Sequence, residues 1–593
     1  MKKIINKTDD IVRDMLEGIA FAYPDIELLP NYKVVKKAVL DPDKVSLIGG
    51  GGSGHEPAHA GFIGRGMLDA AVCGDVFASP SQVQIYNAIR AVSGNKGVLL
   101  IIKNYSGDMM NFKNAAYLAQ EDGIEVEYVR VDDDIAVEDS LYTVGRRGVA
   151  GTIFVHKIAG AAAEQGKPLA EVKRIAEKVV TNVRSLGFAL TSCTVPTKGA
   201  PTFELGETEI EYGVGIHGEP GTQREQLQTA NILAKRMIDS LDKELNLSAD
   251  QARVAVLVNG FGATPLMELY LLNKYVTQEL LDKNIVIARE FVGNYMTSID
   301  MAGASVTILK LDEETETLLN EPAETPGFHV AGKTAETKSI VFDYGIPERG
   351  NQSFEMETPD ECAVISDNKA SLLNIQYLVD AMSVCIIRNE QHFCELDSFA
   401  GDGDFGMSVA KGFRQLKREW PVIIKEHSQD IGEFLGACSL VIMEYCGGAS
   451  GPIWGSAFRA AGRAALGKQQ LSVKEFASIL QSAVNGIQTT GERAFGRGAV
   501  VGDKTLIDAL VPTAEVWNKA DDSDGFARTF TLGAEAAVAG AKSTENFVAH
   551  MGRAGTVGER SIGHPDAGAY ALGEIFTELA QLIGSVLKFS TVC

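Results

Sequence analysis

An apolar strand that runs directly into four consecutive glycines is the feature that most constrains this chain. The sequence from residue 45 to residue 54 is VSLIGGGGSG, and His55 follows it. Glycine has no side chain to shield the backbone, so a ligand can approach the exposed N–H groups closely. A histidine at the end of such a loop is placed for proton transfer. The segment therefore predicts a small-molecule site where a buried strand ends.

Strand-like and helical stretches alternate from residue 44 to about residue 312. The strand-like runs are rich in β-branched residues, and several are almost continuously apolar, as strands buried on both faces are. They cover residues 45–48, 98–103, 124–131, 254–258, 285–287 and 305–311, and a helix is expected over residues 169–185. This alternation predicts an α/β N-terminal half, which we expect to contain two α/β subdomains within residues 1–330.

The pattern changes twice after residue 312. Residues 313–365 are acidic, rich in Thr and Pro and without sustained periodicity, which indicates a linker or an excursion on the surface of the first domain. We place the linker itself at residues 331–368. From residue 370 onward apolar residues recur at helical spacing, and glycine-rich breaks separate the helices. We therefore expect an all-α domain over residues 369–593, with glycine loops gathered at one end in a way that suits a nucleotide.

Charge and cysteine content narrow the classes of partner. The formal net charge is −23 and the sequence pI is about 4.9, so a polyanion would be repelled and nucleic acid is not an expected partner. The eight cysteines are scattered without a CxxC pair, which is typical of reduced core cysteines. The N-terminal segment lacks the apolar core of a signal peptide, and no segment has the length of a membrane span. We expect a soluble cytoplasmic protein that binds no membrane.

A second histidine flanked by glycines, His217, lies far along the chain in the segment YGVGIHGEPG. Each histidine taken alone is better explained as a turn residue that bonds the backbone. Asp108 lies just after the strand at 98–103, and ligand crevices of open α/β sheets lie at such carboxyl strand ends. An aspartate beside His55 would tune the proton affinity and the tautomer of that histidine. Together these residues favour one site built from distant segments.

Three aspartates, Asp397, Asp402 and Asp404, fall within eight residues in the segment LDSFAGDGDFG. Carboxylates that converge from a helix end and a glycine turn can hold a hard divalent cation such as Mg²⁺. A solvated acidic loop is the alternative. An EF-hand does not fit, because Gly406 stands at the third ligand position and no glutamate follows at the twelfth. No Walker A motif is present either, because Asp503 separates the glycine from the lysine in GAVVGDKT.

Taken together, the motifs closely resemble those of the two-domain dihydroxyacetone kinases, and the resemblance covers essentially the whole chain. The segments that look like the substrate-binding half of that family are GGGGSGHEPAHAGF, CGDVFASPS, KNYSGD, RRGVAGT, GVGIHGEPG, NGFGATPLMELY and GNYMTSIDMAG. Those that look like its nucleotide-binding half are LDSFAGDGDFG, GGASGP, GDKTLID and GRAGTVGERSIGHPDAGA. So many long matches in the same order make a chance resemblance negligible.

The resemblance implies an ATP-dependent kinase that converts dihydroxyacetone to its phosphate. It implies that His217 forms a covalent hemiaminal with the substrate carbonyl, and that His55 and Asp108 serve as acid/base partners. The residues implied to bind the substrate are Gly52, Ser53, Gly54, His55, Lys103, Asp108 and His217. Capture of a carbonyl fits the chemistry, because neutral imidazole is a nucleophile and a ketone is an electrophile.

For the C-terminal half the resemblance implies a helical barrel with ATP at one end and Mg²⁺ held by Asp397, Asp402 and Asp404. The residues implied to surround the nucleotide are Phe405, Gly406, Met407, Ser408, Gly448, Ala449, Ser450, Gly498, Leu506, Arg553, Asp566, Ala567 and Gly568. The chain departs from the usual family pattern over residues 555–557 and 566–569, so base contacts are expected to differ there. Because the substrate residues and the metal residues lie on different halves, the halves must meet, and the resemblance favours a head-to-tail homodimer.

Three alternatives to a dihydroxyacetone kinase stay open. A kinase for a tetrulose such as erythrulose needs only a modest discrimination, worth about 1–3 kcal/mol for one extra group. A relative linked to a phosphotransferase system would take phosphate from a phosphohistidine protein, although fusion of both halves argues against it. A carbonyl-binding regulator without catalysis is the third, and the intact set of three aspartates argues against that.

Overall fold

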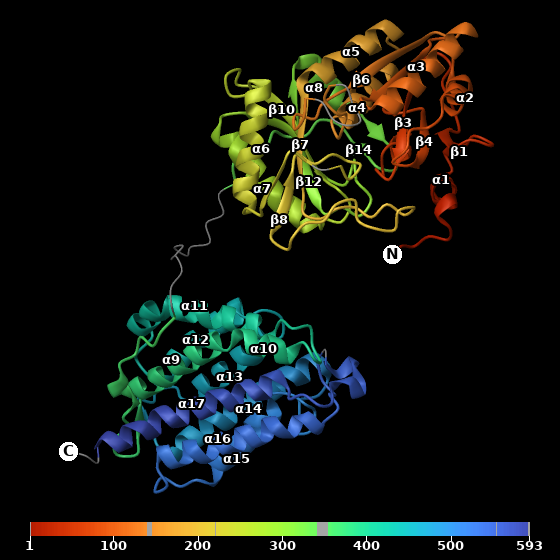
Figure 1. Cartoon of the computed structure of the whole chain (residues 1–593). Coiled ribbons are helices and arrows are strands. Elements are labelled where there is room, and N and C mark those ends of the chain that lie inside the picture. The colour runs from red at the N-terminus through yellow and green to blue at the C-terminus, as the bar shows by residue number, and fades with distance from the viewer. Residues whose placement is uncertain (1, 139–144, 220, 341–353, 553, 591–593) are drawn as a thin grey trace. The chain divides into compact units, whose positions relative to one another are not determined.

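The computed structural model describes residues 2–138, 145–219, 221–340, 354–552 and 554–590. The chain forms two compact units, Met1–Tyr344 and Gly345–Cys593, which are coloured from red to green and from green to blue in Figure 1. The first unit is α/β and the second is helical. Among the described residues, no helix combines the length and the apolarity that a membrane span requires.

The first sheet of the N-terminal unit has the strand order β1-β2-β4-β3-β5-β6. Strand β3 pairs in parallel with both β4 and β5, whereas β1 and β2 add an antiparallel edge. Every residue of β3 and β5 is buried, which explains why apolar residues and glycines fill both strands except at Ser46, Ser53 and Lys103, which lie at strand ends. The strands are β1 (Ile26–Leu28), β2 (Val34–Lys37), β3 (Ser46–Ser53), β4 (Ala70–Val76), β5 (Val98–Lys103) and β6 (Val126–Val131).

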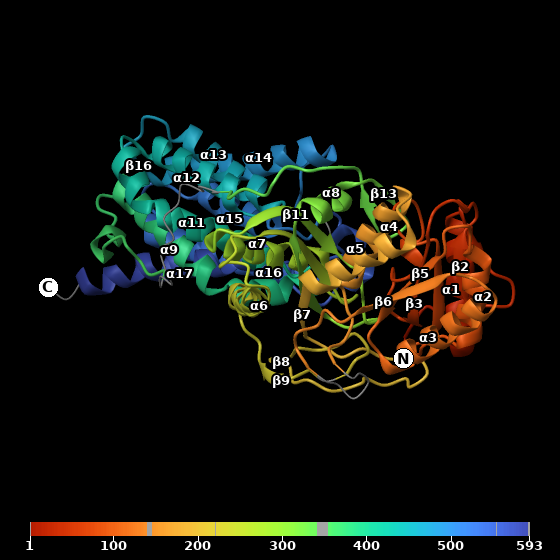
Figure 2. The ribbon, with the colours of Figure 1, turned by 90° about the horizontal axis from the view of Figure 1, so that it is seen from above.

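Helices cover both faces of this sheet. One face packs on α2 and α3, and the opposite face packs on α4 and α5, which lie side by side in Figure 2. Every residue of α4 except Glu164 is buried, so this helix lies inside the unit rather than on its surface. The helices are α1 (Ile11–Ala22), α2 (Gln82–Val92), α3 (Ser106–Glu121), α4 (Thr152–Glu164) and α5 (Leu169–Asn182).

The second sheet of the same unit has the order β11-β10-β12-β7-β8-β9. Only the β10–β11 pairing within it is parallel; the others are antiparallel. Helices α6 and α7 pack on one face, and the other face contributes to the large core around α4. The elements are β7 (Val183–Ala189), β8 (Glu209–Tyr212), β9 (Gln223–Gln226), α6 (Ala230–Leu245), β10 (Arg253–Gly260), α7 (Leu266–Asp282), β11 (Val286–Gly293) and β12 (Gly303–Leu311).

Two sequence expectations need correction here. The helix expected over residues 169–185 ends at Asn182, because Val183 already pairs with β12. The stretch expected to be irregular after residue 312 begins with α8 (Glu313–Asn320), whose start is fixed by a capping box between Asp312 and Thr315. That helix buries two leucines against the first unit, which its short amphipathic pattern did not reveal.

The segment after α8 continues on the surface of the N-terminal unit, as the alternative to a free linker expected. Strand β13 (Ala323–Glu324) pairs with β14 (His329–Val330). Farther along, the Thr337 N–H donates to the carbonyl of Ile287 at 3.0 Å, so residues in the expected linker still lie along β11. Residues 341–353 lie outside the described part of the chain.

The C-terminal unit is built from long helices in which each packs on the next, and α17 also packs on α9 (Figures 1 and 2). Apolar residues from these helices line a cavity of about 190 Å³. The helices are α9 (Leu372–Arg388), α10 (Glu390–Asp397), α11 (Phe405–Glu426), α12 (Ile431–Tyr445), α13 (Ser450–Ala464), α14 (Val473–Phe495), α15 (Ile507–Lys519), α16 (Phe526–Ser543) and α17 (Ala567–Ser590), with a short ladder between β15 (Ala370–Ser371) and β16 (Gln470–Leu471).

Candidate active site

The glycines at the carboxyl end of β3 let the backbone around Phe77 and Ala78 lie closer to this strand than any side chain would permit. A Cβ on Gly52 would lie 2.7 Å from the backbone nitrogen of Ala78, and Gly54 has a φ of +102°. The Ser53 hydroxyl donates to the carbonyl of Gly74 at 2.8 Å, which ties β3 to the end of β4. The predicted residues Gly52, Ser53 and Gly54 therefore form a fixed floor whose backbone is closely packed against the Phe77 loop.

Two buried charged groups, Lys103 and Asp108, lie over this glycine floor. Lys103 ends β5 and Asp108 lies in the first turn of α3, and a Cβ on Gly51 would be 3.3 Å from both Lys103 Nζ and Asp108 Oδ2. Among the described residues, neither Lys103 Nζ nor Asp108 Oδ1 has a hydrogen-bond partner. Burial lowers the pKa of Lys103 and raises that of Asp108, while the attraction between them opposes both shifts. A small ligand with hydroxyl groups would satisfy such a donor and acceptor.

The two predicted histidines meet beside these groups although they are 162 residues apart in the chain. His55 Nε2 lies 3.1 Å from His217 Nε2, and the rings pack edge to face with centroids 4.7 Å apart. His55 Nδ1 lies 2.8 Å from the carbonyl of Thr297, and a carbonyl can only accept, so this nitrogen carries a proton. Burial, followed by the positive charge of Lys103, holds the pKa of His55 well below its usual range. His55 is therefore a neutral imidazole whose Nε2 is free to accept a proton.

Aromatic rings enclose His217 on its other sides. Tyr105 packs edge to face on it at a centroid distance of 4.5 Å, and Phe77 does so at 5.3 Å. The His217 side chain remains 17% exposed, so it is enclosed but reachable. Neither aromatic residue was singled out from the sequence. Phe77 lies in the motif CGDVFASPS and Tyr105 in the motif KNYSGD, but the residues around each give no sign that its ring faces His217.

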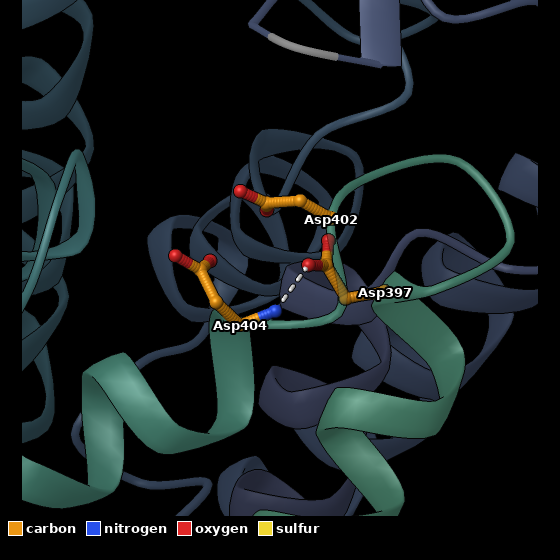
Figure 3. Close-up of side chains that lie close together, drawn as sticks. All are labelled: Asp397, Asp402 and Asp404. Atoms are coloured by element: carbon orange, nitrogen blue, oxygen red, sulfur yellow. Dashed lines mark hydrogen bonds between the residues drawn. The ribbon is translucent and has the colours of Figure 1, made fainter. Parts of the chain in front are cut away.

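In the C-terminal unit the three predicted aspartates converge. Asp397 ends α10, Asp404 immediately precedes α11, and carboxylate oxygens of Asp397, Asp402 and Asp404 all lie within 4.8 Å of one another (Figure 3). The N–H of Asp404 donates to Asp397 Oδ2 at 3.1 Å, which orients that carboxylate. A Cβ on Gly401 would be 2.3 Å from Asp397 Oδ1, so the glycine turn is needed to bring the acids together. Three hard oxygen donors at this spacing fit Mg²⁺.

These aspartates line one wall of a cavity of about 440 Å³, a size within the range of small-molecule sites. Most residues expected around a nucleotide line the same cavity, namely Phe405, Ser408, Gly448, Ala449, Ser450, Leu506, Asp566, Ala567 and Gly568. Gly406, Met407 and Gly498 are not in its lining. Gly406 instead packs on α10, where an added Cβ would be 2.0 Å from the carbonyl of Glu390. Arg553 lies outside the described residues.

Lys504 is a cavity residue that the sequence did not single out. Its Nζ donates to the carbonyls of Thr544 and His564 at 2.6 and 2.7 Å, and burial lowers its pKa. Across the same cavity, burial raises the pKa of Asp566 to about 7, although that carboxylate accepts the N–H of Ala569 at the start of α17. The segment GAVVGDKT, which departs from the Walker A spacing, was the sequence feature that could have pointed to Lys504. The lysine lines a cavity large enough for a small molecule although no P-loop is present.

Residues 17–327 match the Dak1 domain family and residues 399–581 match the DAK2 domain family. The PTS-dependent dihydroxyacetone kinase 1 subunit DhaK of Listeria innocua is 54% identical over 327 residues, which are 55% of this chain and 99% of that subunit. The D-erythrulose kinase of Mycolicibacterium smegmatis is 34% identical over 582 residues, covering 96% of this chain and 97% of that enzyme. The crystal structure of the C. freundii dihydroxyacetone kinase in complex with AMP-PNP and Mg²⁺ covers 98% of this chain and 99% of its own, with 31% identity and a TM-score of 0.59.

Proposed function

Because this chain belongs to the dihydroxyacetone kinase family, with both halves of that family fused, we propose that it transfers the γ-phosphoryl group of ATP to dihydroxyacetone. The observation that carries the proposal is the pairing of His55 with His217 beside Lys103 Nζ and Asp108 Oδ1, neither of which has a hydrogen-bond partner among the described residues. That arrangement offers a nucleophile for a carbonyl and polar partners for the hydroxyls on either side of it. Dihydroxyacetone presents this pattern.

In this proposal, His217 Nε2 attacks the ketone carbon and holds the substrate as a hemiaminal. A polyol without a carbonyl, such as glycerol, cannot be captured in this way. The backbone of the glycine floor, Lys103 and Asp108 bind the hydroxyls and aim one of them outward. Asp108 and His55 then accept the proton of the attacking hydroxyl. The raised pKa of Asp108 supports this role, because a base whose pKa lies nearer neutrality transfers protons more effectively.

In the C-terminal unit, Asp397, Asp402 and Asp404 would hold Mg²⁺, which would neutralise charge on the ATP phosphates when it is bound. The N-terminal ends of α11 and α13 line the same cavity through Phe405, Ser408 and Ser450, and the positive end of each helix dipole there would favour phosphate oxygens. Catalysis would then come mainly from positioning and charge neutralisation. Phosphoryl transfer requires the two sites to come together, and we propose that a head-to-tail homodimer brings them together.

Erythrulose is the second candidate substrate, because a D-erythrulose kinase is similar to this chain along nearly its whole length. The test is ADP release from Mg·ATP with dihydroxyacetone, erythrulose or glycerol, measured for the wild type, for His217→Ala and for the exposed control His329→Ala. We expect turnover with a ketose, none with glycerol and loss of turnover only in His217→Ala. A higher kcat/KM for erythrulose would change the substrate and keep the mechanism.

No ADP release with any ketose would refute the direct kinase. Phosphorylation that appears only when a phosphohistidine donor protein is added would favour a phosphotransferase-linked relative. Ketose binding without turnover under either condition would favour a carbonyl-binding regulator.

A further inference from the structure

We infer that Glu219, held in place by Arg147, is the positioning residue that keeps a proton on His217 Nδ1 and carries the counter-charge for the covalent adduct. The inference rests on the proposed function, because it concerns the hemiaminal step. Glu219 lies two residues after His217 in the segment GIHGEPG, and neither the motif nor the spacing assigns it a role.

The contacts of Glu219 point to His217 from two sides. Its Oε2 accepts the backbone N–H of His217 at 2.7 Å, which fixes the turn that presents the imidazole. Its Oε1 lies 3.6 Å from His217 Nδ1 and has no hydrogen-bond partner among the described residues. Burial alone would raise the pKa of Glu219, but the interaction with His217 and the charge of Arg147 lower it to about 2. A carboxylate therefore faces Nδ1, and a carboxylate accepts only.

Arg147 makes this carboxylate part of a fixed network. Its side chain is 1% exposed, donates to Asp134 at 2.7 Å and donates to the carbonyl of Gly213 at 2.8 Å. Its Nη1 lies 3.8 Å from Glu219 Oε1. Asp134 and Gly213 hold the guanidinium of Arg147 in place. The guanidinium therefore restrains the Glu219 carboxylate from 3.8 Å but forms no bidentate pair with it. The free Oε1 is left to His217.

The proton positions at the two histidines follow from these contacts. His55 keeps its proton on Nδ1 for Thr297, so the hydrogen in the 3.1 Å contact between the two Nε2 atoms comes from His217. Glu219 favours a second proton on His217 Nδ1. Without substrate, each ring nitrogen of His217 then faces an acceptor, Nδ1 facing Oε1 of Glu219 and Nε2 facing Nε2 of His55.

In the proposed step, capture of the ketone begins with a proton on each ring nitrogen of His217, and the step balances from there. The Nε2 proton of His217 moves to Nε2 of His55, which leaves a lone pair on His217 Nε2 and a proton on its Nδ1. The lone pair forms the C–N bond, the π electrons of the carbonyl move to its oxygen, and that oxygen takes the proton back from His55. The product is an N-alkylated imidazolium with one positive charge, as before, and Glu219 stabilises this charge.

The experiment follows the ketone carbon of [2-¹³C]dihydroxyacetone by NMR on the full-length protein, with Glu219→Gln as the test and Glu207→Gln, an exposed glutamate twelve residues earlier, as the matched control. We expect a tetrahedral carbon signal in the wild type and in the control at the same ligand concentration. In Glu219→Gln the dissociation constant should rise by about 10- to 100-fold, the usual effect of losing an interaction with a charged group. Affinity for AMP-PNP should be unchanged.

A tetrahedral signal in Glu219→Gln with a dissociation constant within twofold of the wild type would overturn the inference and leave the kinase function intact. Absence of the signal from the wild type would refute the covalent step itself. A second measurement does not depend on any substitution of Glu219. In ¹⁵N-histidine-labelled wild type with bound dihydroxyacetone, the resonance that His217→Ala removes should show a protonated Nδ1, and an unprotonated Nδ1 there would also refute the role of Glu219.

Discussion

Replacing Gly52 by alanine should disturb ligand binding much more than it disturbs folding. The added Cβ would lie 2.7, 2.8 and 2.9 Å from backbone atoms of Ala78 and Phe77. None of the three atoms belongs to a flexible side chain, so the Phe77 loop must move by several tenths of an ångström. Overpacking of this kind destabilises by about 1–3 kcal/mol. The φ of Gly52 is not in the left-handed region, so no backbone strain adds to that figure.

Movement of this loop shifts a ring that packs on both histidines. Phe77 stacks on His55 at a centroid distance of 5.3 Å and contacts His217 at the same distance. We therefore expect the dissociation constant for dihydroxyacetone to rise at least tenfold, whereas the N-terminal unit should stay folded because domains hold about 5–15 kcal/mol. Urea unfolding and ¹³C-detected titration measure the two quantities separately.

Gly18→Ala is the matched control. It lies in α1, and a Cβ there would meet nothing within 4 Å. This variant should stabilise the unit by up to about 1 kcal/mol through helix propensity and leave ligand affinity unchanged. If Gly52→Ala bound dihydroxyacetone like the wild type and unfolded at the same urea concentration, the close packing of the floor would not be what shapes the site.

Two further predictions concern the metal aspartates and acid stability. Asp402→Asn should lower Mg·ATP-dependent turnover by at least about 100-fold, with dihydroxyacetone affinity unchanged; retention of turnover would assign the cluster to a solvated loop. His156 is fully buried against His59, and burial lowers its pKa to about 3. Below the ordinary histidine pKa of about 6.5, His156 binds a proton in the unfolded chain but stays neutral in the folded one. The free energy of unfolding therefore falls as the pH falls from about 6.5 toward 3. His156→Asn should flatten the slope of unfolding free energy against pH between about 6 and 4, and an unchanged slope in urea titrations would contradict this.

Local patterns predict single elements of this fold well. The run 98–103 has the bounds of β5, because a parallel strand buried on both faces reads as a nearly continuous apolar run, here Val98–Ile102, and Lys103 ends it. The helices α9 and α14 follow from apolar spacing alone. Strand order does not follow, since nothing in the sequence of β12 indicates that it inserts between β10 and β7 in antiparallel register.

The site shows the same difference between what a local pattern predicts and what only the folded chain shows. Asp397, Asp402 and Asp404 can be predicted as a cluster because a short loop must bring them close. His55, Lys103 and Asp108 can be predicted as a group, because they follow neighbouring strands of one sheet. The partnership of Glu219 with His217 cannot, because it depends on how a turn directs one carboxylate and on an arginine seventy-two positions earlier.

Lys103 Nζ and Asp108 Oδ1, which have no hydrogen-bond partner among the described residues, have a thermodynamic consequence. Lys103 and Asp108 are withdrawn from water before any ligand arrives, so the free N-terminal unit carries part of the desolvation penalty that binding normally incurs. A ligand that completes their hydrogen bonds relieves this penalty and binds only the folded form, so it raises the unfolding free energy by RT ln(1 + [L]/Kd). The melting temperature of this unit thus reports ligand occupancy, and an analogue that lacks one hydroxyl would leave one of the two groups unsatisfied and stabilise the unit less at equal concentration.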